Sequence, residues 1–263
     1  MLDRRPFLHV RDVSKIFSVG NERVEALHKV DLIVGKGEFV CLIGASGCGK
    51  STLLRIVAGF EAPTSGDVRV YDAPITGPGS DRGMVFQDYA LFPWMTVREN
   101  VAFGPKQKGL RDARDIADRY LDMVGLSKFA DRYPYQLSGG MKQRVAIARV
   151  LANEASLLLM DEPFGALDAL TREQLQDELL EIWSRTKVTI LFVTHSVEEA
   201  TLLADRVVVM TAGPGRIESD NLIRLSRPRD VSSPEFNAVR RDVARRLTSH
   251  LAPKRALEAA AAL

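Results

Sequence analysis

The sequence predicts an α/β fold built on a mainly parallel sheet. Two apolar runs, LLLM at 157–160 and ILFV at 190–193, are continuous rather than alternating, which is typical of parallel strands covered on both faces. A glycine-rich loop at 44–52 stands between an apolar strand and a segment with apolar residues at helical spacing. Sheets of this kind bind ligands beyond the carboxyl ends of their strands, so functional residues are expected there.

The elements of this fold can be placed in order along the chain. Strand patterns are found at 7–13, 24–34, 39–43, 67–72, 157–160, 189–193 and 206–210. Helices are expected after the glycine loop at 50–60 and again at 171–186, and a turn is expected at 77–83. Residues 88–153 are predicted to be mainly helical, because apolar residues recur there at helical spacing.

The composition argues against several classes of protein. The chain has 263 residues, of which 46% are hydrophobic and 27% charged, as in ordinary folded proteins. Its net charge of +2 gives no electrostatic case for a nucleic-acid partner. No apolar run is long enough to cross a bilayer, and residues 1–13 lack the apolar core of a secretory signal. Cys41 and Cys48 are expected to be reduced thiols without a structural role.

The loop GASGCGKST at 44–52 matches the pattern G-x-x-x-x-G-K-[ST] in full. Its glycines let backbone N–H groups turn inward toward a β-phosphate, and the N-terminus of the following helix favours negative charge. Lys50 can reach the β- and γ-phosphates, and the Ser51 hydroxyl can bind Mg²⁺. The alternative is a glycine-rich turn without a ligand, and the strand and helix on either side argue against it.

Two carboxylates follow the apolar strand at 157–160. Asp161 stands at the carboxyl end of the strand, where it can hold Mg²⁺ directly or through water. Glu162 comes next and can take a proton from a water that attacks the γ-phosphate. The alternative is an acidic cap for the next helix.

Two further polar residues also follow predicted strands. His195 leaves the sheet on the same side as Asp161, where it can sense the γ-phosphate, although a lone histidine is more often structural. Gln87 can orient water or contact Mg²⁺, and its alternative is a polar turn.

A second stretch, LSGGMKQR at 137–144, also has the residues of a phosphate site. Ser138 is a suitable N-cap, and Gly139 and Gly140 expose the N–H groups of the first helical turn. From the residues alone, a well-capped helix start without a ligand is the favoured alternative.

Together, these motifs resemble those of the ATP-binding subunit of an ABC transporter, in the family's order and over nearly the whole chain. The loop at 44–52 resembles the Walker A motif, Gln87 the Q-loop, LSGGMKQR the signature motif, LLLMDE at 157–162 the Walker B strand, GALD at 165–168 the D-loop and His195 the switch histidine. Phe17 corresponds to the aromatic residue that stacks on adenine, although from the sequence alone it would be a core strand residue.

The resemblance implies a P-loop NTPase core with a mainly parallel sheet, an N-terminal antiparallel β subdomain and an inserted helical subdomain. We expect residues 1–263 to form a single ABC ATPase domain. Its α/β core and β subdomain would comprise 1–87 and 154–263, and its helical subdomain 88–153.

The same resemblance implies ATP and Mg²⁺ as cofactors. The residues expected at this subunit's own ATP are Phe17, Gly44, Ala45, Ser46, Gly47, Cys48, Gly49, Lys50, Ser51 and Thr52. Catalytic roles are expected for Glu162, His195, Gln87 and Lys50, and Mg²⁺ ligands are Ser51, Gln87 and Asp161.

In that family two subunits pair head to tail, and each ATP lies between the Walker A loop of one and the signature motif of the other. The resemblance therefore implies that Ser138, Gly139 and Gly140 contact the ATP of a second copy of this chain. Asp168, in the D-loop, would contribute a dimer contact.

Residues 77–104 are similar to importers of the nitrate, aliphatic sulfonate and taurine group, and the Pro93–Trp94 pair is the telling feature. In such systems the subunit lies at the cytoplasmic face of the membrane and serves a permease, which receives its solute from an external binding protein. The permease would dock near the Q-loop, on an apolar cluster of Leu91, Phe92, Trp94 and Met95. Ordinary packing within the helical subdomain is the alternative for that cluster.

Two other function classes share part of this pattern. A soluble ABC-type ATPase that acts on nucleic acid or ribosomes usually carries a long coiled-coil insertion or two ATPase units, and neither is visible. A P-loop kinase would have no use for the signature motif. The basic segment RRDVARRL at 240–247 is expected to be a solvated helical face, with attraction to anionic lipid as the alternative. The segment ALEAAAAL at 256–263 is expected to be a frayed tail.

Overall fold

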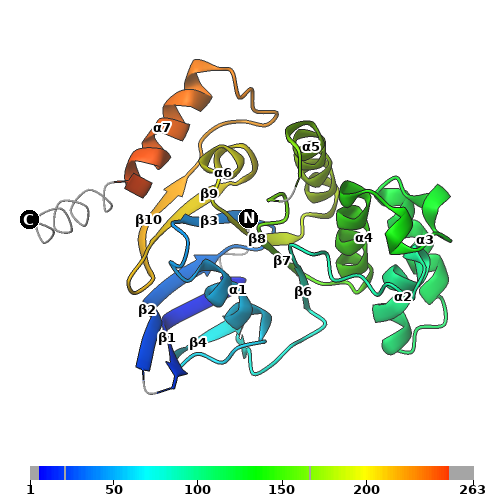
Figure 1. Cartoon of the computed structure of the whole chain (residues 1–263), viewed down its shortest axis with the longest axis horizontal. Coiled ribbons are helices and arrows are strands. Elements are labelled where there is room, and N and C mark those ends of the chain that lie inside the picture. The colour runs from blue at the N-terminus through cyan, green and yellow to red at the C-terminus, as the bar shows by residue number, and fades with distance from the viewer. Residues whose placement is uncertain (1–5, 21, 166, 249–263) are drawn as a thin grey trace, which may run out of the picture. The chain divides into compact units, whose positions relative to one another are not determined.

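The computed structural model describes residues 6–20, 22–165 and 167–248 (Figure 1), so the segment at 256–263 lies outside the described residues. The chain divides into two compact units. The first unit consists of Met1–Gly77 and Leu191–Leu263, and the second unit consists of Pro78–Ile190. The segment 88–153, which we expected to be the helical subdomain, falls within the second unit.

The first unit contains a four-stranded antiparallel sheet of order β2-β1-β4-β5. Its strands are β1 (Leu8–Val19), β2 (Glu22–Val34), β4 (Ser65–Val70) and β5 (Ala73–Pro74). In the register Leu8 stands opposite Val34 of β2 and Val70 of β4, and all three side chains are buried. The end of β2 alternates between buried and exposed residues, as expected for a sheet with one face on the core. The expected N-terminal antiparallel β subdomain is confirmed.

Two strands of the second sheet in this unit run parallel. They are β3 (Phe39–Gly44), buried at all six positions, and β9 (Arg206–Thr211), and β10 (Arg216–Leu222) pairs with β9 in antiparallel orientation. The helices of the unit are α1 (Lys50–Ala58), α6 (Val197–Leu203), which packs against β3, and α7 (Pro234–Thr248), which packs against α6 and β9. The basic segment at 240–247 therefore lies on a helix.

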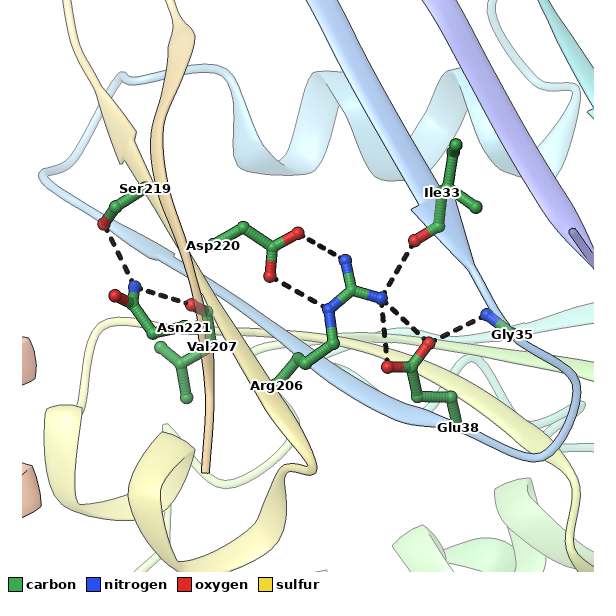
Figure 2. Close-up of polar contacts among 8 residues, drawn as sticks. All are labelled: Ile33, Gly35, Glu38, Arg206, Val207, Ser219, Asp220 and Asn221. Carbon is green, nitrogen blue, oxygen red and sulfur yellow. Dashed lines mark hydrogen bonds and ion pairs between the residues drawn. The ribbon is translucent and has the colours of Figure 1, made fainter. Parts of the chain in front are cut away.

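Through one guanidinium group, Arg206 of β9 joins β2, β10 and the residue before β3 (Figure 2). Its Nη1 donates to the Ile33 carbonyl and to both carboxylate oxygens of Glu38, each at 3.0 Å. Its Nε donates to Asp220 Oδ1 at 2.9 Å, and its Nη2 pairs with the other oxygen of that carboxylate. Glu38 also accepts from the backbone N–H of Gly35. Hydrogen bonding to Asp220 and then to Glu38 raises the pKa of Arg206, so the group stays charged.

The second unit pairs β6 (Arg82–Val85) with β7 (Leu157–Asp161) in parallel. The expected turn at 77–83 is thus wrong in its last two residues, which begin β6. The unit's α-helices are α2 (Val97–Gln107), α3 (Ala113–Met123), α4 (Gly139–Ala152) and α5 (Ala169–Thr186), with short 3₁₀ turns at Ser127–Phe129 and Pro134–Gln136. Helices α2, α3 and α4 pack against one another, and α4 also contacts β6 and α5.

Strand β8 (Thr189–Thr194) has six consecutive buried residues, including the ILFV run that indicated a covered parallel strand. It contains residues of both units, because the boundary between them falls after Ile190.

Candidate nucleotide-binding site

The glycine loop of the first unit connects β3 to α1. Lys50 is the first residue of α1, and its buried ammonium group donates to the carbonyl oxygens of Gly44 at 2.8 Å and Ala45 at 3.0 Å. Two carbonyls at the start of the loop therefore hold the side chain of Lys50, which follows the loop. A phosphate group that enters the loop competes with these two carbonyls for the ammonium.

Two glycines of this loop are required by close packing. A Cβ on Gly44 would lie 2.5 Å from Cys48 Sγ and 2.6 Å from the carbonyl of Met210. Gly49 has a φ of 87°, and its Cβ would lie 2.5 Å from Leu27 Cδ2. The structure thus adds a packing reason to the phosphate-binding reason for glycine here.

The two cysteines are free and buried, as expected for reduced thiols. Burial, followed by the nearby Glu199 carboxylate, raises the pKa of the Cys41 thiol. Cys48, by contrast, packs inside the loop and lies 3.7 Å from Lys50 Nζ. The Cys48 sulfur fills the space beside Gly44.

Phe17 and His195 are the other expected site residues of the first unit. Phe17 is half-buried on β1, and the Lys15 ammonium lies 4.9 Å from its ring centroid. His195 is exposed directly after β8. On one side of it Thr194 donates to the Glu199 carboxylate at 2.6 Å, and on the other Ser196 caps α6, so both of its neighbours in the chain are anchored.

In the second unit, β7 ends at Asp161, and the chain then turns sharply. Glu162 has a φ of 45°, in the left-handed region that residues other than glycine rarely adopt. Such strain costs roughly 1–3 kcal/mol and is concentrated at functional sites. The Gly165 N–H donates to the Glu162 carbonyl at 3.1 Å, and a Cβ on Gly165 would lie 3.5 Å from Gln87 Nε2. Gln87 and the loop after Asp161 are therefore close neighbours.

The turn after Gln87 contains two consecutive left-handed residues, Tyr89 with a φ of 63° and Ala90 with a φ of 44°. Arg149, on α4, donates to both of their carbonyls, at 3.2 Å and 2.8 Å, and lies over the ring of Phe92. Burial lowers the pKa of Arg149 and raises that of Tyr89. One arginine thus holds a strained turn in place.

The signature stretch begins helix α4, as expected both for a capped helix start without a ligand and for a phosphate site. Ser138 is exposed and its Oγ accepts from the Met141 N–H at 3.3 Å, so it is an N-cap. A Cβ on Gly139 would lie 3.2 Å from Tyr89 Oη and 3.3 Å from Leu167 Cδ2. Gly139 therefore also lets α4 approach the loops beside it.

Asp168 is the N-cap of α5 and accepts from the Thr171 N–H at 3.0 Å. This backbone hydrogen bond holds the pKa of the exposed Asp168 carboxyl below its usual value. The D-loop thus ends in a charged, ionised group at the start of a helix.

A family model for ABC transporters matches residues 27–165, which is more than half of the chain. The chain belongs to the ABC transporter family. It is an ATP-binding subunit, and hence an ATPase coupled to transport.

Two curated relatives and one solved structure illustrate the similarity. The nitrate import ATP-binding protein of Synechocystis sp. is 52% identical over 230 residues, which cover 87% of this chain and 86% of that protein. The taurine import ATP-binding protein of Roseobacter denitrificans is 53% identical over 216 residues, which cover 81% of each. A dimeric ATP-binding cassette in a post-hydrolysis state with ADP and Pi is 34% identical, with a TM-score of 0.72, covering 83% of this chain and 100% of that one. The expected ABC fold class and the resemblance to the nitrate and taurine group are confirmed.

The residues expected at the ATP site fall in both units. The first unit carries Phe17, the Walker A loop and His195, and the second carries Gln87, the signature motif, the Walker B carboxylates and Asp168. Among the residues that the structure describes, no helix is long and apolar enough to cross a membrane. No group of three or more His, Cys, Asp or Glu side chains suited to a metal occurs in the described ranges either.

The apolar cluster of the ABC subunit follows the Q-loop. Phe92 contacts Trp94 and Phe103, with ring centroids at 5.7 Å and 4.8 Å, and Trp94 is 70% exposed. Leu91 and Met95 are half-buried. The structure thus shows partial packing together with one exposed aromatic side chain.

Sequence reasoning missed two residues that support these segments. Asn100 is fully buried on α2, and its amide binds the backbone of residues 92–96. Arg149 supports the Q-loop turn, as described above. The available signal was the same for both, namely a single polar residue on the apolar side of a predicted helix.

Proposed function

We propose that two copies of this chain bind two ATP molecules head to tail and drive uptake of a small anion through a membrane permease. The observation that carries this proposal is the presence of two phosphate-type loops in one chain. In the Walker A loop, the carbonyls of Gly44 and Ala45 accept hydrogen bonds from Lys50. The signature motif begins α4 at the exposed Ser138. A solved relative with a similar fold is dimeric and holds ADP and Pi.

The proposed roles follow from the chemistry of the residues. Lys50 would exchange the carbonyls of Gly44 and Ala45 for the β- and γ-phosphates, and Phe17 would stack on adenine. Ser51, Gln87 and Asp161 offer only oxygen ligands of the kind that Mg²⁺ prefers, so they suit this ion. When bound, Mg²⁺ would neutralise charge that develops on the phosphate oxygens.

The strained Glu162 would accept the proton of the attacking water, and Gln87 would orient that water. His195 would contact the γ-phosphate from the end of β8. Ser138, Gly139 and Gly140 would offer N–H groups to the ATP of the partner, beside the dimer contact of Asp168. ATP would favour closure only through its higher affinity for the closed pair, and loss of phosphate would reopen it.

The names of the relatives support an import system for a small anion, since they include nitrate and taurine import proteins. We propose that the subunit is peripheral at the cytoplasmic face of the membrane and binds the permease through the cluster of Leu91, Phe92, Trp94 and Met95. An external binding protein would supply the solute. Neither relative's name refers to nucleic acid or ribosomes. The net charge of +2 does not favour the alternative of a soluble ABC-type ATPase that acts on them.

Docking of the permease is tested by affinity purification of the tagged chain from membranes of its own host. Trp94→Ser removes the exposed ring, so we expect a loss of most of the hydrophobic multi-span partner that copurifies. Tyr135→Ser is the matched control, because Tyr135 is 75% exposed in the same unit but outside the cluster. Equal recovery of the partner with both variants would contradict docking at the cluster. Recovery of nucleic acid instead of a membrane partner would support a soluble ABC-type ATPase that acts on nucleic acid.

A further inference from the structure

The side-chain amide of Gln143, on the signature helix α4, takes no part in the interactions described above. Its side chain is fully buried, and neither Oε1 nor Nε2 has a hydrogen-bond partner among the residues that the structure describes. Burying an amide without partners is costly, and such groups are rare in native proteins. The position therefore requires an explanation.

Asn100 shows how the same unit treats a buried amide. Its side chain is equally buried, and its Oδ1 accepts from the Phe92 N–H while its Nδ2 donates to three backbone carbonyls. The second unit can thus satisfy a buried amide completely. Gln143 differs from Asn100 because its amide lacks such partners among the described residues.

The spacing along α4 shows what surrounds Gln143. It follows Gly139 by four residues and Gly140 by three, so the three positions share one face of the helix. Long side chains on a helix lean toward its N-terminus, which brings Gln143 over the two glycines of the signature motif. Gly139 lies next to Tyr89 Oη and Leu167 Cδ2. Gly140 lies next to Leu175 and Thr171 of α5, so the Tyr89 hydroxyl is the polar side-chain group that these glycine contacts place on the face of Gln143.

We infer that Gln143 is a positioning residue for ATP hydrolysis. Its amide forms a hydrogen bond with the Tyr89 hydroxyl when the signature end of α4 engages the partner's ATP. Satisfying a buried amide only in the closed dimer stabilises that state relative to the resting one. This inference rests on the proposed dimer, and in it Gln143 links the signature helix to the turn after Gln87 at closure.

The test compares Gln143→Met with the parent chain, because methionine has a similar length and volume but needs no hydrogen bond. In nucleotide-free protein we expect Tm to rise by about 2–4 °C. In steady-state ATPase assays we expect kcat to fall by about tenfold or more, with little change in KM for ATP, since positioning is lost and binding is not. A residue with only a structural role would not change stability and turnover in opposite directions.

Tyr89→Phe removes the proposed hydroxyl partner. We expect a similar loss of kcat, and the double variant should lose little more than either single one, as for residues that act as a pair. Gln176→Met is the matched control, because Gln176 is also a buried glutamine on a neighbouring helix, α5. This control should leave kcat near the parental value.

A kcat for Gln143→Met within about twofold of the parent would overturn the inference. A lower Tm, or failure of this variant to fold, would also overturn it, because the amide would then already support the resting state. The parent and Ser138→Arg are assayed in parallel. If the parent is inactive, or if Ser138→Arg retains full activity, the proposed function itself fails. If Gln143→Met is active while Ser138→Arg is inactive, only the inference about Gln143 fails.

Discussion

At the scale of single residues, the candidate site combines strain with unusual hydrogen bonding. Glu162 has a left-handed φ of 45° directly after a buried strand, and Lys50 is held by the carbonyls of its own loop. Motif spacing predicted the types of these residues and their positions beside strands. It could not predict the strain at Glu162, because the backbone angle depends on the hydrogen bond from Gly165 and on the packing around it.

The role of Glu162 can be tested by a change that keeps its size. We expect Glu162→Gln to bind ATP with near-parental affinity and to lose roughly 10²- to 10⁴-fold in turnover, because the amide cannot accept the proton. Nucleotide binding and phosphate release measure the two effects separately. Glu173→Gln, an exposed position on α5, is the control. Turnover of Glu162→Gln near the parental rate would rule out this residue as the base.

At the scale of elements, the hydrophobic pattern predicted the buried strands. It did not predict the polar edge strand or the side chains that link one element to another. The continuous apolar runs of β7 and β8 and the glycine loop before α1 gave correct element types. Strand β10 was missed, because its sequence RIESDNL is mostly polar and pairs only along β9 on one side. The links made by Arg149 and Arg206 were also missed, since they join segments far apart in sequence.

The Arg206 network predicts where the first unit is sensitive. Arg206→Ala leaves Glu38 and Asp220 without their shared cation, and Arg206 and Glu38 are each less than a fifth exposed. We expect the free energy of unfolding to fall by about 1–3 kcal/mol, measured by denaturant titration. Arg246→Ala breaks an exposed pair with Asp242 on α7 and should cost less than about 1 kcal/mol. Equal losses in the two variants would show that the network adds nothing beyond a surface ion pair.

At the scale of the whole molecule, the ABC motifs are divided between two units. The Walker A loop and His195 belong to the first unit, whereas the signature motif, the Walker B carboxylates and the D-loop belong to the second. From its residues alone, the signature stretch is best explained as a capped helix start, and Ser138 does cap α4. Only the family resemblance predicted its intermolecular use, because no pattern within one chain reveals what a second copy contacts.

The shared ATP site is the central claim, and it is tested most directly by the molecular mass of Glu162→Gln in the presence of ATP, with and without Ser138→Arg. Light scattering should show a dimer for Glu162→Gln. It should show a monomer for the double variant, which still binds ATP, because the arginine blocks only the loop that faces the partner's nucleotide. A double variant that dimerises as well as Glu162→Gln, or one that no longer binds ATP as a monomer, would contradict the account.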